Sequence, residues 1–175
     1  MKTIIFTILL ILGSNFESKV QKHALKLQKN VIAQDTTYDY CINLIKRYEK
    51  FVPERYELFG RYYIGYGHMV DPFFSEKITE IQADSILRRD FNISIKQVNS
   101  LGLRISYSKR YLLSCFVFNC GIGTLRKSKL LEMLKNKDDD SLIKNQYLKY
   151  CYADGKYISK LLDRRSKEFE IIGYR

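Results

Sequence analysis

Residues 45–68 read IKRYEKFVPERYELFGRYYIGYGH, and this stretch decides the fold. The spacing of apolar residues predicts a helix that starts at an N-cap in residues 35–37 and stops at Pro53. The quoted stretch begins in the last part of this helix. Residues 55–70 are rich in Tyr, Phe, Ile and Gly and predict a small hairpin or meander that turns at Gly60. This layout sets the carboxyl group of Glu49 at the lip of a cleft, with the hairpin as the facing wall.

The rest of the chain carries helical patterns. Thr79 and Gln82 form a capping-box signature that opens a helix extending to Val98. Ser106 opens a third helix that reaches about Asn119, is apolar on most sides and is expected to be the central buried helix. We expect Phe118 to be buried there, and Gly121 and Gly123 to end the helix. Three further helices are expected to follow: one capped by Ser128, one capped by Asp138–Asp140, and one with its apolar residues between Ile158 and Ile172. The predicted class is α+β, mostly α, with one early β-element.

Length and composition favour one cationic domain. Hydrophobic residues make up 46% of the 175 residues, and 30 Lys+Arg against 19 Asp+Glu give a net charge of +11. Such a charge suits an anionic partner, either a membrane surface or an acidic wall polymer. Nucleic acid is not expected, because no Arg/Lys-rich recognition helix is present. We expect a monomer.

The N-terminus resembles an export signal. Lys2 precedes the apolar run of residues 4–12, and small residues follow. We therefore expect a signal peptide or signal-anchor at residues 1–17, a basic lead-in at 18–37 and the functional domain at 38–175. The lead-in is either a solvated spacer or an amphipathic helix on an anionic membrane. The predicted location is the periplasm or the extracellular space, with a membrane tether if the signal is retained.

The cysteines and histidines predict neither a metal site nor a cofactor. Four cysteines and two histidines show no Cys-x-x-Cys spacing. Free cysteines packed as small hydrophobic side chains are favoured. Disulfides that join Cys41 to Cys115 or to Cys151 stay open, because export permits them.

Glu49 suits the general acid of a glycoside hydrolase. Such enzymes usually need a protonated carboxylic acid beside the leaving oxygen and a second group that activates water or stabilises the cationic sugar. The aromatic neighbours Tyr48 and Phe51 favour a partly desolvated, protonated carboxyl. Alone, a Glu at a helix end would be an ordinary solvated residue, and its distance to the Gly-Tyr-Gly-His hairpin is what favours the catalytic interpretation.

The chain resembles the phage-type lysozyme (endolysin, muramidase) family, glycoside hydrolase family 24. The resemblance rests on short sequence motifs that follow one another in the same order as in the family. They are Glu49 at the end of a helix, Tyr-Ile-Gly-Tyr-Gly-His, and residues 78–84, 118–123, 128–131, 155–156 and 164–169. It implies a lysozyme-like fold with a small β-hairpin lobe and a helical C-terminal lobe. It also implies cleavage between N-acetylmuramic acid and N-acetylglucosamine in peptidoglycan glycan strands, with Glu49 as the acid. The residues expected to contact substrate are Tyr66, His68, Asn119 and Arg165, with Arg164 or Arg165 near Glu49.

One departure from the family pattern leaves the second catalytic group open. Many members have Asp or Cys in the first hairpin strand and Thr before Ile-Gly-x-Gly-His, whereas this chain has Glu57-Leu58 and Tyr63. Glu57 and Tyr63 are the candidates, with Glu54 as a third choice. A single-acid lytic transglycosylase would need only Glu49. A non-catalytic wall-binding protein is the alternative outside enzymes, and a membrane-active protein that uses residues 19–31 is another.

Overall fold

The computed structural model describes residues 2–153 and 155–173, with side chains described for residues 19–29, 36–153 and 155–171. The chain divides into two units, Met1–Thr36 and Thr37–Arg175. In the first unit the backbone is helical, and the side chains of residues 19–29 are all exposed. The predicted export signal lies outside the described side chains. Within the described part of the chain, no helix combines the length and hydropathy that a membrane span needs.

Helix α1 (Lys2–Glu49) differs from its predicted bounds at both ends. It includes residues 35–37, so the predicted helix start there is wrong. It ends at Glu49, before Pro53, where Lys50 takes a left-handed φ of 60° and donates its N–H to the carbonyl of Lys46. The C-terminal part of α1 is amphipathic, and its buried face holds Cys41, Ile42, Leu44, Ile45 and Tyr48.

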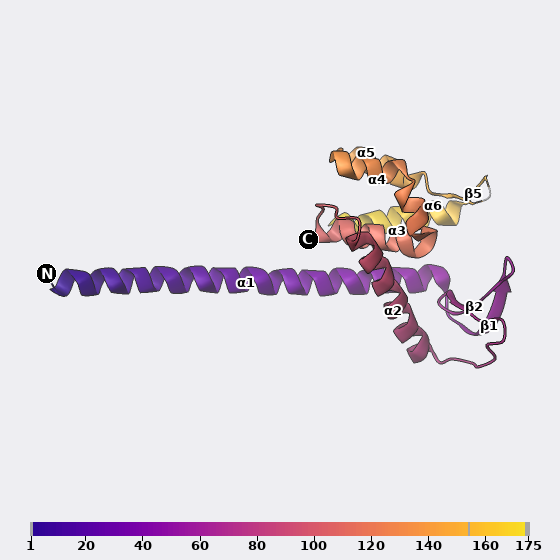
Figure 1. Cartoon of the computed structure of the whole chain (residues 1–175), viewed down its shortest axis with the longest axis horizontal. Coiled ribbons are helices and arrows are strands. Elements are labelled where there is room, and N and C mark those ends of the chain that lie inside the picture. The colour runs from indigo at the N-terminus through magenta and orange to yellow at the C-terminus, as the bar shows by residue number, and fades with distance from the viewer. Residues whose placement is uncertain (1, 154, 174–175) are drawn as a thin grey trace. The chain divides into compact units, whose positions relative to one another are not determined.

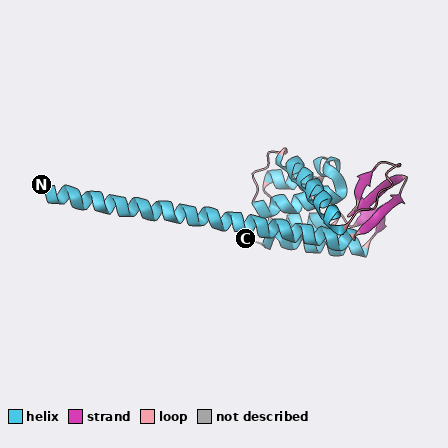
Figure 2. Ribbon diagram, turned by 90° about the horizontal axis from the view of Figure 1, so that it is seen from below, coloured by secondary structure: helices cyan, strands magenta, loops and turns pink. Residues whose placement is uncertain are grey.

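The predicted meander is confirmed. Strands β1 (Val52–Leu58), β2 (Arg61–Gly65) and β3 (His68–Val70) form an antiparallel sheet in the order β1-β2-β3. Tyr56 pairs with Tyr63, and Glu57 pairs with Tyr62. Because side chains alternate across a strand, these two pairs occupy opposite faces of the sheet. Figure 2 shows the strands gathered at one end of the helices of the second unit.

Helices make up most of the second unit (Figure 1), which confirms the α+β, mostly α class. They are α2 (Glu80–Asn99), α3 (Tyr107–Arg126), α4 (Lys129–Asn136), α5 (Asp140–Leu148), α6 (Ser159–Phe169) and the 3-10 helix η1 (Glu170–Gly173). The predicted N-caps of α2 to α5 are confirmed. In each, the side-chain oxygen accepts a hydrogen bond from a backbone N–H in the first turn of the helix, and the capping residues are Thr79, Ser106, Ser128 and Asp139. The sequence did not predict the short hairpin β4 (Tyr152–Ala153) and β5 (Lys156–Tyr157).

Helix α3 is the predicted central buried helix. Leu112, Leu113, Cys115 and Phe116 are at most 2% exposed, and α3 packs on α2, α4, α6 and η1. It extends past the predicted end to Arg126, with a kink where Gly121 adopts φ 80° and ψ 152°, a conformation that favours glycine. Phe118 is half-buried rather than buried, so that prediction is wrong.

All four cysteines are free thiols. Cys41 and Cys115 are fully buried in the same hydrophobic cluster, to which side chains from α1, the sheet and α2 also belong. Burial raises the pKa of the Cys115 thiol well above its ordinary value, and the adjacent Cys41 thiol adds to this. These cysteines therefore behave as the small hydrophobic side chains that the sequence favoured.

The capping box of α2 offers a first test of the local structure. Thr79 Oγ1 accepts from the N–H of Gln82, while Gln82 Oε1 accepts from the N–H of Thr79 at 2.8 Å. We expect Thr79→Ala to lower the free energy of unfolding by about 1 kcal/mol, because a backbone donor loses its partner. Urea denaturation measures this change. The control Ser85→Ala, on the exposed face of the same helix, should stay within about 0.5 kcal/mol of wild type.

Candidate active site

A cleft of about 510 Å³ opens between the sheet and helices α2 and α3 in the second unit. Each bordering element contributes to it: the end of α1, one face of the sheet, the β2–β3 turn, α2 and α3. The residues that line it are Glu49, Tyr56, Leu58, Tyr63, Tyr66, Gly67, His68, Met69, Asp90, Ile93, Ser94, Val117, Phe118 and Asn119. Its walls are mainly aromatic and aliphatic with a few polar groups, which is typical of a ligand site.

Glu49 is the carboxylate at the junction of the helical part and the sheet. Its Oε1 accepts a hydrogen bond from Arg164 Nη1 at 2.6 Å, and its side chain is 25% exposed. Its Oε2 faces Gly67, where a Cβ would lie 3.6 Å away. One oxygen is therefore held by the protein, and the other faces the β2–β3 turn on the cleft side.

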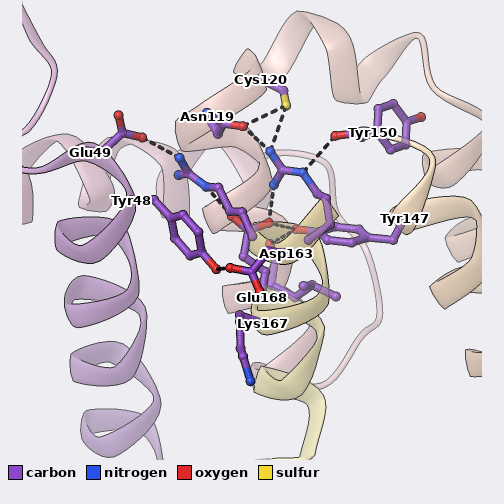
Figure 3. A network of polar contacts seen from close by, with 12 residues as sticks. Tyr48, Glu49, Asn119, Cys120, Tyr147, Tyr150, Asp163, Lys167 and Glu168 are labelled. Atoms are coloured by element: carbon purple, nitrogen blue, oxygen red, sulfur yellow. Dashed lines mark hydrogen bonds and ion pairs between the residues drawn. The ribbon is translucent and has the colours of Figure 1, made fainter. Parts of the chain in front are cut away.

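Arg164 reaches Glu49 from a buried ion network on α6, drawn in Figure 3. Its Nε donates to Glu168 Oε1 at 2.9 Å, while Glu168 Oε2 accepts from Arg165 Nη1 and, at 2.7 Å, from the hydroxyl of Tyr147. Glu168 is 1% exposed and Arg165 is fully buried. Burial would lower the pKa of Arg164, but Glu168 and Glu49 raise it above its ordinary value, so Arg164 stays charged.

This network sets the electrostatics of Glu49. The guanidinium of Arg164 lies at hydrogen-bond distance from Glu49 Oε1 and holds that oxygen in place. Arg164 also faces Glu168, so its single positive charge is shared between two carboxylates. The arrangement orients the carboxylate of Glu49.

A second branch of the network reaches the cleft wall. Arg165 Nη2 donates to Asn119 Oδ1, and its Nε donates to the carbonyl of Tyr150 at 3.2 Å. Asn119 is exposed at the end of the regular part of α3, just before Gly121. Arg165 thus positions the side-chain amide of Asn119, which lines the cleft, from the buried side.

His68 and Asp90 form a second polar pair in the cleft. His68 Nδ1 lies 2.6 Å from Asp90 Oδ2, and His68 Nε2 lies 3.3 Å from Arg89 Nη2. A guanidinium nitrogen only donates, so Nε2 is the acceptor and the Nδ1–H donates to Asp90. This bond joins the start of β3 to α2.

The structure brings together most of the residues that the sequence proposed. Tyr63, Tyr66, His68 and Asn119 line the same cleft as Glu49. Tyr66 is buried there and donates its hydroxyl to Glu80 at 2.7 Å.

Two of the proposed residues lie elsewhere. Glu57 is exposed on the face of β1 opposite Tyr56, outside the cleft lining. Arg165 is fully buried behind Asn119, and Arg164 is the arginine beside Glu49.

Sequence reasoning missed two functional-site residues. Glu168 follows Arg164 by four residues, and this helical ion-pair spacing was the available signal. Asp90 carried no local signal, because its role depends on the approach of His68 from another element.

Gly67 offers a test of the close approach to Glu49. It has a φ of 83°, and a Cβ added at this position would lie 3.6 Å from Glu49 Oε2. We expect Gly67→Ala to cost about 1–2 kcal/mol of stability through left-handed strain and to lower activity, because the new methyl group contacts the acid. Gly60→Ala, with a φ of 71° and open space around its Cβ, is the control that shows the strain without the contact. Equal activity losses in both variants would contradict the assigned contact.

The fold and the cleft together define a lysozyme-like protein, with a carboxyl group between a small sheet and a helical lobe. The sequence profile of the phage lysozyme family matches residues 46–168. The chain belongs to the phage lysozyme family. The match begins at the end of α1 and includes every residue that lines the cleft.

Sequence relatives of the chain are endolysins, which agrees with this family. The chain is 33% identical over 134 residues to the endolysin of Bacillus phage PZA, covering 73% of this chain and 51% of that protein. It is 30% identical over 131 residues to the endolysin of Acyrthosiphon pisum secondary endosymbiont phage 1, covering 71% of this chain and 89% of the relative. The chain spans about half the length of the Bacillus phage relatives it matches.

Solved structures share the fold. The muramidase domain of SpmX from Asticaccaulis excentricus superposes with a TM-score of 0.67 at 25% identity, covering 75% of this chain and 92% of that domain. A P22 lysozyme mutant superposes with a TM-score of 0.62 at 26% identity, covering 75% of this chain and 93% of the other.

Proposed function

We propose that this protein is a muramidase that cleaves the β-1,4 bond between N-acetylmuramic acid and N-acetylglucosamine in peptidoglycan. The observation that carries this proposal is the position of Glu49, with Oε1 held by Arg164 and Oε2 on the cleft side. A carboxyl group so placed can give its proton to the glycosidic oxygen of a bound glycan. Similarity to endolysins and to a muramidase domain supports the same activity.

The charge supports a wall polymer as substrate. A net charge of +11 favours association with an anionic polymer through long-range attraction. We propose that the protein acts outside the cytoplasm, with residues 1–17 as the export signal. A membrane-contacting role for the basic lead-in is a further hypothesis, which predicts membrane lysis that survives Glu49→Gln.

One observation favours a second candidate, a lytic transglycosylase. Among the residues that line the cleft, the carboxylates are Glu49 and Asp90, and Asp90 is bonded to His68. No free second carboxylate therefore faces Glu49 in this part of the chain. In a transglycosylase, the C6 hydroxyl of the muramic acid attacks C1, and Glu49 serves first as acid and then as base.

Digestion of purified peptidoglycan separates these functions. The full chain is incubated with peptidoglycan, and the released fragments are identified by mass spectrometry. A muramidase leaves a reducing N-acetylmuramic acid, while a transglycosylase leaves a 1,6-anhydro end that is one water lighter. Binding without any released fragment would overturn both proposals and support a non-catalytic wall-binding protein.

A further inference from the structure

Two of the tyrosines that line the cleft, Tyr56 and Tyr63, belong to the sheet. Tyr56 on β1 and Tyr63 on β2 are direct cross-strand partners, with ring centroids 5.8 Å apart. Both are half-buried, and both line the cleft together with Glu49. Their rings lie side by side on the sheet side of the cleft, tilted by 30° to each other.

The hydroxyl groups of these tyrosines are available to a ligand. Other tyrosine hydroxyls near the site are engaged with carboxylates: Tyr48 with Asp163 at 2.6 Å, and Tyr66 with Glu80 at 2.7 Å. Among the side chains that the structure describes, none is hydrogen-bonded to the hydroxyl of Tyr56 or Tyr63. A half-buried hydroxyl without a partner is a site where a substrate oxygen can bind.

Tyr56 is also close enough to Glu49 for the two groups to interact electrostatically. Burial raises the pKa of Tyr56 above its ordinary value, and the negative charge of Glu49 raises it further. The phenol is therefore protonated at neutral pH. It can donate or accept a hydrogen bond, but it does not act as a charged base.

We propose that Tyr56 and Tyr63 are catalytic residues that together take the place of the second carboxylate in this cleft. Their oxygen lone pairs and ring faces stabilise the positive charge that develops on the sugar at the scissile bond. An aromatic face within about 6 Å of a cation attracts it, most strongly where water is excluded. This inference rests on the proposed glycan-cleaving function and adds to it a specific pair of residues.

The reaction balances without a second carboxylate. Glu49 gives its proton to the glycosidic oxygen, the bond from C1 to that oxygen breaks, and the bonding electrons leave with the oxygen. The attacking oxygen, from water or from the C6 hydroxyl of the same sugar, forms the new bond to C1. Its proton passes to the Glu49 carboxylate, which restores the acid. In this sequence of steps the hydroxyl groups of Tyr56 and Tyr63 transfer no proton.

Conservative substitutions separate this role from a structural one. Tyr56→Phe and Tyr63→Phe remove only the hydroxyls, and Tyr56→Leu also removes the aromatic face. Tyr62→Phe is the matched control, because Tyr62 lies on the opposite face of the same sheet, where its ring packs against Arg55 at 4.4 Å. Initial rates on soluble, uncross-linked glycan strands give kcat and KM, and thermal unfolding reports stability.

We expect Tyr56→Phe and Tyr63→Phe each to lower kcat by about 10- to 100-fold with KM nearly unchanged, the pattern of an interaction made only in the transition state. Tyr56→Leu should lose more, and Tyr62→Phe should match wild type. Melting temperatures of the Phe variants should equal that of wild type.

Two results would overturn the inference. The first is a Tyr56→Phe/Tyr63→Phe double variant with kcat within twofold of wild type, and the second is a loss of kcat that follows a loss of stability. If Glu49→Gln is inactive while the tyrosine variants keep full activity, only this inference fails. If the wild-type chain releases no fragment, the proposed function fails and the inference fails with it.

Discussion

Glu49→Gln is expected to abolish release of peptidoglycan fragments. An amide cannot give a proton to the leaving oxygen, and general acid catalysis contributes about 10²–10⁴-fold. The fold should survive, because the amide oxygen can still accept from Arg164 and because Arg164 keeps its ion pair with Glu168. Fragment release and the melting temperature, measured on the same preparation, check both parts.

Glu132→Gln is the control for this variant. Glu132 is an exposed carboxylate on α4, outside the cleft lining, so its loss should leave turnover unchanged. Near-wild-type turnover by Glu49→Gln would remove Glu49 from the role of acid. A large fall in melting temperature would instead show that the pair with Arg164 maintains the fold.

The second large effect is expected at Glu168, at the centre of the buried network. Its two oxygens compensate Arg164 and Arg165, and they also accept from Tyr147. Glu168→Gln removes that charge while keeping nearly the same shape, and it leaves Arg165 fully buried without an ionic partner. Removal of one partner from a buried ion pair costs about 3–5 kcal/mol, because the remaining charge is desolvated and uncompensated.

Chemical denaturation measures this loss, with Glu170→Gln as the matched control. Glu170 forms an ion pair with Lys167 at 2.9 Å, but its side chain is 54% exposed. Such pairs are worth about 0–1 kcal/mol, because water screens them. Similar losses in the two variants would contradict the compensating role of Glu168. Activity of Glu168→Gln should also fall, since Arg164 orients Glu49.

Local patterns predicted the elements well where the signal lay within a few residues. The capping box at Thr79 and the meander at residues 55–70 follow from short-range hydrogen bonding and from alternation of side chains. Element ends were predicted less well. Lys50 ends α1 in a left-handed conformation that no residue type required, and α3 continues through a kink at Gly121.

The residues of the candidate site likewise divide into those that the sequence predicted and those that it did not. The sequence proposed Glu49, Tyr63, Tyr66, His68 and Asn119, and the structure places all of them around one cleft. It proposed Glu57 as a base, and strand alternation turns that side chain to the other face of the sheet. The role of Glu57 stays a hypothesis that its position does not support.

The sequence by itself determined the family, the mostly helical fold and the Glu49-to-hairpin layout, because these depend on residue spacing along the chain. Only the tertiary structure decided which arginine reaches Glu49 and which residues face it. Arg164 and Arg165 are adjacent in sequence, yet successive residues on a helix point about 100° apart. Arg164 therefore reaches Glu49, and Arg165 lies buried and bonds to Asn119. Tyr56 lines the same cleft as Glu49 because the pairing of β1 with β2 and the packing of the sheet bring them together, an arrangement that the spacing of residues along the chain does not encode.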